Sequence, residues 1–221
     1  MFDFLHTLAK GGIVMVPLGL CSLASLTVLI ERFAVLRRAS AGTDPLMTDL
    51  RGCIARNDLL SALEKADAVP GPVAAVLAQG IKAELTGYSP EQAMEEEAMI
   101  QVPLLQCRLA VLDTVVTIAP LLGLLGTVVG MISSFHILAI AGAEHPAGIT
   151  SGIAEALIAT ATGLVIAIFS LVGLNWCQEK VRSIGVDIEQ RATQLSNWLA
   201  QVQLAQLAQL EREHANSLAA V

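Results

Sequence analysis

The sequence has little charge, few aromatic residues and only isolated cysteines. Charged residues make up 15% of the 221 residues, whereas 54% are hydrophobic and the mean hydropathy is +0.65. Soluble domains usually carry about 25% charged residues. We therefore expect the protein to lie in a lipid bilayer.

These scarcities exclude several other classes. The four cysteines form no CxxC pair and have no histidine at ligand spacing, which argues against a metal site and a disulfide framework. The net charge of -7, with no basic patch, excludes a nucleic-acid-binding protein. No nucleophile and base pattern and no phosphate loop are present, so we expect no catalytic residues, no cofactor and no enzyme. Aromatic residues amount to only 4%, so the apolar residues are typical of helices rather than barrel strands.

Three segments are long and apolar enough to cross a bilayer. Residues 11–30 and 114–143 contain no Asp, Glu, Lys or Arg. Residues 149–178 contain one charged residue, Glu155. A helix needs about 20 such residues to span the hydrocarbon core. We predict an all-α protein with three transmembrane helices. The predicted divisions are the N-terminus and first span (1–38), a cytoplasmic helical domain (39–110), the second span (111–143), a periplasmic turn (144–148), the third span (149–178), and a cytoplasmic helical extension and tail (179–221).

The basic residues around the first span predict the orientation. Arg32, Arg37 and Arg38 follow this span, whereas only Lys10 precedes it. Positive charge marks the cytoplasmic side of a membrane helix. We expect the N-terminus in the periplasm and the C-terminus in the cytoplasm.

Helix signals also occur outside the spans. We predict cytoplasmic helices over residues 45–64 and 72–85, and a third that starts at Ser89-Pro90. The acidic run at 95–97 is either a solvated helix face or a docking site for a basic partner. Beyond Arg182 the apolar spacing predicts that the third span continues as a helix, with Gly185 as the expected interruption and fraying from about His214.

The main candidate site residue is Glu155 in the third span. A charge at this depth costs roughly 2.5 to 3.5 kcal/mol, so such a residue usually belongs to an ion pathway or a partner contact. Alternatively, the side chain snorkels to the headgroups. At 100° per residue, Glu155 shares a helix face with Ser151, Ala159 and Thr162, whereas Thr160 lies on another side and stays ambiguous.

Threonine and glycine residues accompany this acid. A hairpin with its midpoint near residues 143 and 144 puts Thr127 and Thr160 at one depth. Threonine hydroxyls either line a pathway or bond to the preceding turn of their own helix. A second group has small residues at helical spacing, which permits close helix packing. It comprises Gly123, Gly126, Gly130 and Gly163.

Two stretches resemble a known family. APLLGLLGTVVGMISSF (119–135) and GIAEALIATATGL (152–164) are similar to the MotA/TolQ/ExbB proton-channel family, nearest to its ExbB and TolQ branch. The resemblance implies a homopentamer in the bacterial inner membrane. Its second and third helices would line a pore that holds a dimer of an ExbD- or TolR-like single-span protein. By motif, Glu155, Thr127 and Thr160 match the family's pore-facing polar residues.

The resemblance also implies a function. We expect a subunit that uses the proton motive force to energise an envelope process such as TonB-dependent transport, acting through a TonB-like or TolA-like protein. The alternative is a passive oligomeric scaffold that conducts no protons. The chain departs from the family at Phe169, where a proline is usual, so we expect a straighter inner half of the third span.

Overall fold

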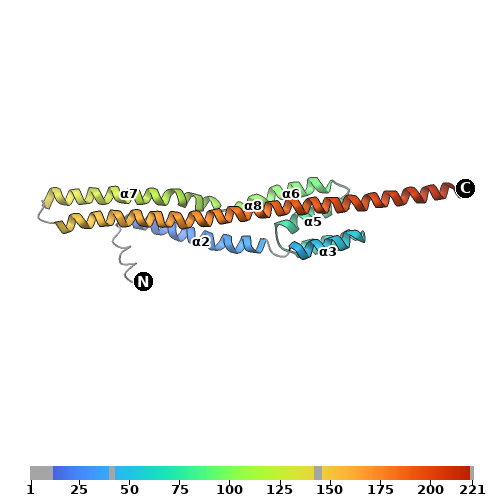
Figure 1. The fold of residues 1–221 in the computed structure, drawn as a ribbon, viewed down its shortest axis with the longest axis horizontal. Coiled ribbons are helices and arrows are strands. Elements are labelled where there is room, and N and C mark those ends of the chain that lie inside the picture. The colour runs from blue at the N-terminus through green and yellow to red at the C-terminus, as the bar shows by residue number, and fades with distance from the viewer. Residues whose placement is uncertain (1–11, 40–42, 142–145, 220–221) are drawn as a thin grey trace. The chain divides into compact units, whose positions relative to one another are not determined.

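The computed structural model describes residues 12–39, 43–141 and 146–219, and within these ranges it contains helices and no strands (Figure 1). The helices, in chain order, are α2 (Met15–Ala39), α3 (Thr43–Ala55), α4 (Leu59–Ala68), α5 (Pro72–Thr86), α6 (Pro90–Gln106), α7 (Leu109–Ala141) and α8 (Pro146–Ala219). The predicted all-α class is confirmed.

Three helical regions are long and apolar enough to cross a membrane. They lie within Met15–Ala55, Pro90–Ile140 and Thr150–Arg212. Their mean hydropathies are 1.7, 2.2 and 2.3. This agrees with the prediction of three spans.

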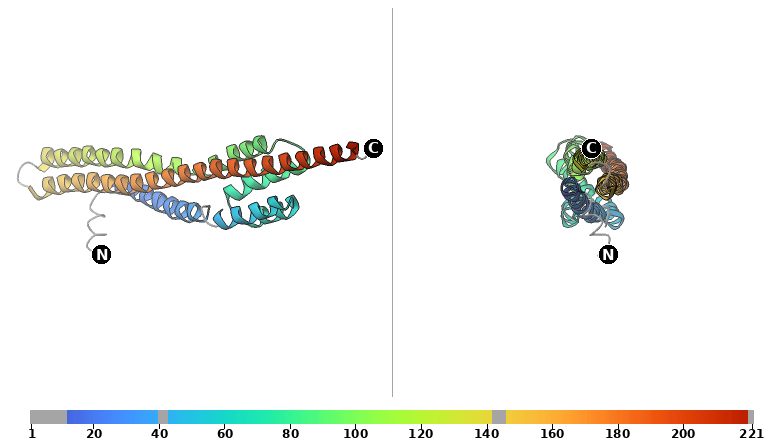
Figure 2. Two further views of the ribbon diagram at one scale, coloured as in Figure 1. Left: turned by 45° about the vertical axis from the view of Figure 1, so that its right-hand side comes forward. Right: turned by 90° about the vertical axis from the view of Figure 1, so that its left-hand side faces the viewer.

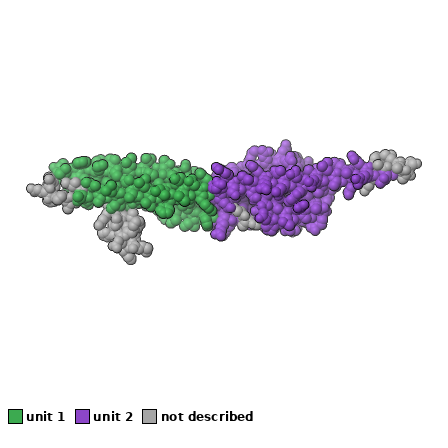
Figure 3. All heavy atoms as spheres, viewed as in Figure 1, with its two compact units in different colours: residues 1–33, 107–178 green, residues 34–106, 179–221 purple. Residues whose placement is uncertain are grey.

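The chain divides into two compact units, coloured separately in Figure 3. Unit 1 comprises residues 1–33 and 107–178, and unit 2 comprises residues 34–106 and 179–221. Both α2 and α8 contribute residues to each unit. Unit 1 therefore contains most of the apolar spans, and unit 2 contains α3 to α6.

In unit 1, α7 and α8 run alongside each other and α2 packs against them, as the views of Figures 1 and 2 show. A cluster of buried residues joins the three helices: Val14, Leu18, Val115, Ala119 and Ala167. Large apolar side chains also cover the outside of this unit. An outer surface of this kind is expected for helices that face lipid or neighbouring chains.

Polar contacts attach α2 to its two neighbours. Ser25 Oγ lies 2.6 Å from Ser170 Oγ on α8, and both residues are buried. Glu31 of α2 also forms an ion pair with Arg108, which lies just before α7. Within α2, the same carboxylate pairs with Arg32 at 2.9 Å. Because few polar groups are available in these helices, such contacts fix how α2 meets α7 and α8.

Unit 2 contains four shorter helices and the second part of α8. α5 packs against α4 and α6, and α3 packs against α4. Buried apolar residues of α8 continue the core along one face of that helix. They are Val181, Ile184, Ile188, Leu195 and Leu199.

The predicted single helix over 45–64 is wrong, because α3 and α4 are separate. Asn57 has a left-handed φ of 58°, which ends α3, and Asp58 caps α4 by accepting a hydrogen bond from the Ser61 amide at 3.1 Å. Hydrogen bonds from the Ser61 side chain and backbone lower the pKa of Asp58. The cap therefore contributes stability above the unfolded-state pKa of 3.8, and this contribution is lost as the pH falls through the lower folded-state value.

The other helix boundaries in unit 2 lie close to the expected ones. α5 starts at Pro72 and ends one residue after Leu85. α6 starts at Pro90, where Ser89 Oγ accepts a hydrogen bond from the Gln92 amide at 3.4 Å. It runs through Pro103 and ends at Gln106.

α8 is longer and more regular than predicted. It has no interruption at Gly185, so the predicted break there is wrong, and the helix extends to Ala219. Fraying from His214 stays a prediction. One helical glycine costs only about 1 kcal/mol, which burial of the stripe from Val181 to Leu199 outweighs. The helix also continues through Phe169, whose side chain is exposed.

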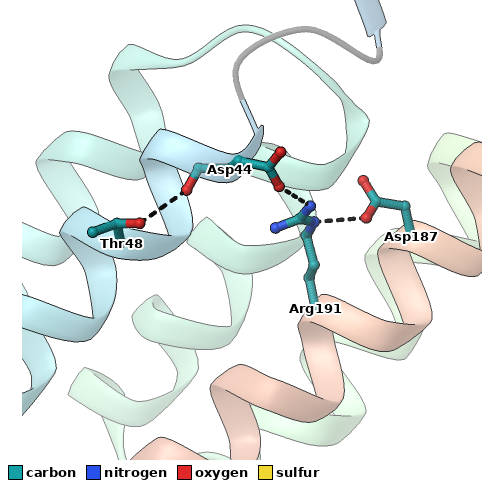
Figure 4. A network of polar contacts seen from close by, with 4 residues as sticks. All are labelled: Asp44, Thr48, Asp187 and Arg191. Atoms are coloured by element: carbon teal, nitrogen blue, oxygen red, sulfur yellow. Dashed lines mark hydrogen bonds and ion pairs between the residues drawn. The ribbon is translucent and has the colours of Figure 1, made fainter.

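A polar network in unit 2 joins α3 to α8 (Figure 4). Arg191 donates hydrogen bonds to Asp187 Oδ1 at 2.6 Å and Asp44 Oδ1 at 2.5 Å, and Thr48 donates to the Asp44 carbonyl at 3.2 Å. Burial lowers the pKa of the Arg191 guanidinium, but the two carboxylates outweigh it and the net effect raises this pKa. Arg191 therefore stays charged and holds the two helices together.

Replacing Arg191 tests this network. We expect Arg191→Ala to lower the free energy of unfolding by about 1 kcal/mol, because a charge-assisted contact between two helices is lost. The matched control is Arg182→Ala, since the pair with Glu179 at 3.8 Å is exposed on both sides and should change stability by less than about 0.5 kcal/mol. Equal effects in thermal unfolding in detergent would contradict a special role for Arg191.

Candidate functional site

The candidate site lies in unit 1, where small residues bring α7 and α8 close together. A Cβ atom added to Gly130 would lie 2.7 Å from the Gly152 carbonyl oxygen and 2.9 Å from the Ala156 Cβ. At Gly163 it would lie 2.5 Å from the Ala119 carbonyl oxygen. Both glycines are therefore in contact with the backbone of the facing helix.

Gly123 and Gly126 occupy the same interface. A Cβ on Gly123 would lie 3.0 Å from the Thr160 Cα, and one on Gly126 would overlap the Ala159 side chain. Gly126 also faces the turn that precedes α2, because its added Cβ would lie 3.8 Å from the Val14 Cβ. The four glycines singled out in the sequence thus lie along one continuous contact between helices.

These contacts give a different register from the predicted one. Gly130 faces Gly152, and Gly123 faces Thr160, so the hairpin midpoint lies near residues 141 and 142. The prediction of a midpoint near residues 143 and 144, which places Thr127 level with Thr160, is therefore wrong. The two threonines are instead offset by about one helical turn. Close packing of small residues, rather than the midpoint of the turn, sets the register.

The three candidate threonines make different hydrogen bonds. Thr160 donates across the interface to the Gly123 carbonyl oxygen at 2.9 Å. Thr127 donates to Leu124 of its own helix at 2.6 Å, and Thr162 donates to Ile158 of its own helix at 2.8 Å. Thr160 therefore joins two helices, whereas the hydroxyls of Thr127 and Thr162 are satisfied locally.

Glu155 lies on α8 and contacts the segment that precedes α2. A Cβ on Gly12 would overlap the Glu155 carboxylate, so the acid occupies the space left by the missing side chain. Gly12 has a positive φ of 73°, and its carbonyl accepts the first hydrogen bond of the turn, from Met15 at 3.1 Å. Glu155 is partly exposed, and none of the ion pairs among the described residues involves it.

The structure does not bring all the candidate polar residues together. Glu155 faces the start of α2, Thr160 faces α7, and Thr127 and Thr162 bond along their own helices. Sequence reasoning missed Gly12, Gly152 and the Ser25–Ser170 contact. The only local signal for Gly12 was a glycine just before an apolar run, which does not indicate a contact with residue 155.

Unit 2 has a groove of its own. It has a volume of about 720 Å³ and lies between α6 and α8. Glu91, Glu95 and Glu189 contribute acidic groups, and Met94 and Ile188 contribute apolar surface. Glu95, from the acidic run at 95–97, therefore borders this groove and is also exposed.

Comparison with known proteins identifies the family. The sequence model of the MotA/TolQ/ExbB proton channel family matches residues 68–190, more than half of the chain. This region includes α7 and the part of α8 that carries Glu155. The chain belongs to this family. Its members are transport and energiser proteins rather than enzymes.

Individual relatives agree with this assignment. The chain is 32% identical over 170 residues to an ExbB-like protein 3 of Synechocystis, covering 75% of this chain and 80% of that protein. It is 31% identical over 170 residues to the biopolymer transport protein exbB1 of Vibrio cholerae, covering 73% of each. It is 32% identical over 178 residues to the Tol-Pal system protein TolQ of Pseudomonas aeruginosa, covering 74% and 76%. The protein is thus a multi-pass membrane protein of the ExbB and TolQ type.

Close packing of α7 and α8 can be tested by adding one methyl group. Gly130→Ala should lower the free energy of unfolding by about 1 to 3 kcal/mol, because the added Cβ meets backbone that cannot move aside. Gly185→Ala is the control, since its Cβ would meet nothing within 4 Å and should be neutral or stabilising by up to about 1 kcal/mol. A Gly130→Ala protein as stable as the control in thermal unfolding would refute the observed contact.

The hydrogen bond of Thr160 gives a second test. Thr160→Val should lower the free energy of unfolding by about 1 kcal/mol, because the Gly123 carbonyl loses its cross-helix donor, whereas Thr160→Ser keeps a hydroxyl. Thr162→Val removes only a bond within α8 and is the matched control. If the two valine variants unfold at the same temperature, the cross-helix bond does not stabilise the pair.

Proposed function

We propose that the protein is a proton-conducting subunit of an energising complex in the bacterial inner membrane. The observation that carries the proposal is the position of Glu155, the only carboxylate among the described apolar turns of α8 between residues 150 and 178. Membership of a proton channel family supports a role in proton movement. Glu155 is partly exposed and forms no ion pair with another described residue, and both features support a role in proton exchange.

The proposed assembly follows the family. Five copies would form a ring around a pore lined by α7 and α8, with Glu155, Thr127, Thr160 and Thr162 along the proton pathway. A dimer of an ExbD- or TolR-like single-span protein would lie inside the ring. The N-terminus would lie in the periplasm and the C-terminus in the cytoplasm.

The mechanism depends on the energy of proton transfer. One proton moving through 100 mV yields about 2.3 kcal/mol, enough to bias two states of the partner by more than tenfold. Protons would pass the Glu155 ring and change the position of the partner inside the pore. The partner would transmit this movement to a TonB-like or TolA-like protein and so energise an envelope process such as TonB-dependent transport.

A passive scaffold is the second candidate. One observation favours it: Glu155 contacts Gly12, just before α2 of the same chain. A contact of this kind would hold α2 against α8 without any proton transfer. In that case Glu155 conducts nothing. Collapse of the proton gradient in cells separates the two functions, because a scaffold keeps its output and a proton-driven subunit loses it.

Replacement of Glu155 tests the proposed function directly. Glu155→Gln keeps the size and hydrogen-bonding ability of the side chain but cannot exchange a proton, so proton flux should fall by about 100-fold or more. Assembly, measured by the size of the purified complex, should be unchanged. The control Glu179→Gln alters an exposed acid of the same helix and should conduct normally.

The flux is measured with a pH-sensitive dye in liposomes that contain the protein with its coexpressed partner. Normal flux in the Glu155→Gln variant would end the proposal. Loss of assembly in this variant would instead favour the scaffold.

A further inference from the structure

The space beside Gly12 is filled by the carboxylate of Glu155, and no other described glycine of this chain receives an acidic side chain in this way. Two features make glycine necessary at this position. A Cβ would overlap the carboxylate, and the φ of 73° is one that other residues adopt at a cost. The two requirements are independent of each other, which allows them to be separated by experiment.

The turn that begins at Gly12 is a suitable neighbour for an acid. The Gly12 carbonyl accepts from Met15 at 3.1 Å and the Ile13 carbonyl accepts from Val16 at 3.3 Å, so the chain is already turning into α2 here. The aligned peptide dipoles give the start of a helix a partial positive charge. The carboxylate of Glu155 thus lies at the favourable end of α2.

The neighbouring contacts hold this arrangement in place. Val14 and Leu18, which follow Gly12, are buried in the core with Ala119 and Ala167. Next to Glu155, Ala156 is buried against Gly130 of α7. Both partners of the contact are therefore attached to rigid helices, and a small change at Gly12 should move the carboxylate rather than the backbone of α8.

We propose that Gly12 is a positioning residue for Glu155: its missing side chain lets the carboxylate rest against the first turn of α2, which places the acid for proton exchange. The effect of Gly12 on proton exchange rests on the proposed function, but the contact between Gly12 and Glu155 can be measured without proton conduction. The inference adds the first span, which contains none of the candidate residues predicted from the sequence, to the proposed proton site.

The test uses dicyclohexylcarbodiimide, an apolar reagent that modifies protonated carboxyl groups in membranes. The labelling rate of Glu155 in the full-length protein is measured by mass spectrometry, and Glu155→Gln identifies the labelled site. In Gly12→Ala the methyl group displaces the carboxylate into another rotamer, and labelling should become faster by about threefold or more. Gly19→Ala, also near the start of α2, is the control, because its Cβ would meet nothing within 4 Å and the rate should not change.

A double-mutant cycle separates overlap from backbone strain. Aspartate is one methylene shorter, so in Glu155→Asp the carboxylate no longer reaches Gly12. The proposal predicts that Gly12→Ala changes the labelling rate when residue 155 is Glu and has little effect when it is Asp. Equal effects in both backgrounds would mean that only strain at Gly12 matters, and no effect in either would mean that the contact does not exist; each result overturns the proposal.

Two further measurements complete the test. If Gly12→Ala fails to assemble, Glu155→Asp must restore assembly, and failure of the double variant to assemble overturns the proposal. In liposomes, Gly12→Ala should lower proton flux by about tenfold, since a displacement of about 1 Å is costly for proton transfer. Labelling does not require conduction, so a failure of the proposed function in the Glu155→Gln experiment is distinguishable from a failure of this inference.

Discussion

Close contact between α7 and α8 is the constraint on which the rest of unit 1 depends. Gly123, Gly126, Gly130 and Gly163 leave no room for side chains, so the two helices meet through backbone atoms and small groups. In a membrane, apolar side chains gain little by leaving lipid for another helix, so packing and hydrogen bonds must hold the pair. The contact sets the register, and the register brings Thr160 to the Gly123 carbonyl.

The same constraint explains how one acid is accommodated. Small residues form the close contact between α7 and α8, and the carboxylate of Glu155 lies against Gly12, just before α2. There it contacts a glycine near the positive end of a helix, and none of the ion pairs among the described residues involves it. A fixed ion pair would hold the charge in place, whereas contact with a glycine is compatible with the proton exchange proposed for Glu155.

The sequence predicted the elements better than the contacts. The lengths of the apolar segments correctly predicted three helices that could span a membrane. Ser89 and Pro90 correctly predicted the start of α6, because helix-capping signals are local. The register was off by about one turn because it was taken from the turn, and helix packing overrides the turn. Two further predictions failed for reasons that are not visible in the local sequence. Asn57 adopts a left-handed φ and ends α3 where a continuous helix was predicted. α8 continues through Gly185, where a break was predicted, because its neighbours on the same helix are buried. The partner of Glu155 was not predictable, since 142 residues separate it from Gly12 and no local pattern links them.

The central claim is that the carboxyl group of Glu155 changes its protonation state as the protein works. Infrared difference spectroscopy between energised and de-energised membranes measures this most directly, because a protonated carboxyl group has its own absorption band. The account predicts a carboxyl band that appears and disappears with the proton gradient in the native complex and is missing from Glu155→Gln. A band that persists unchanged in Glu155→Gln, or a native complex without any carboxyl signal, would contradict it.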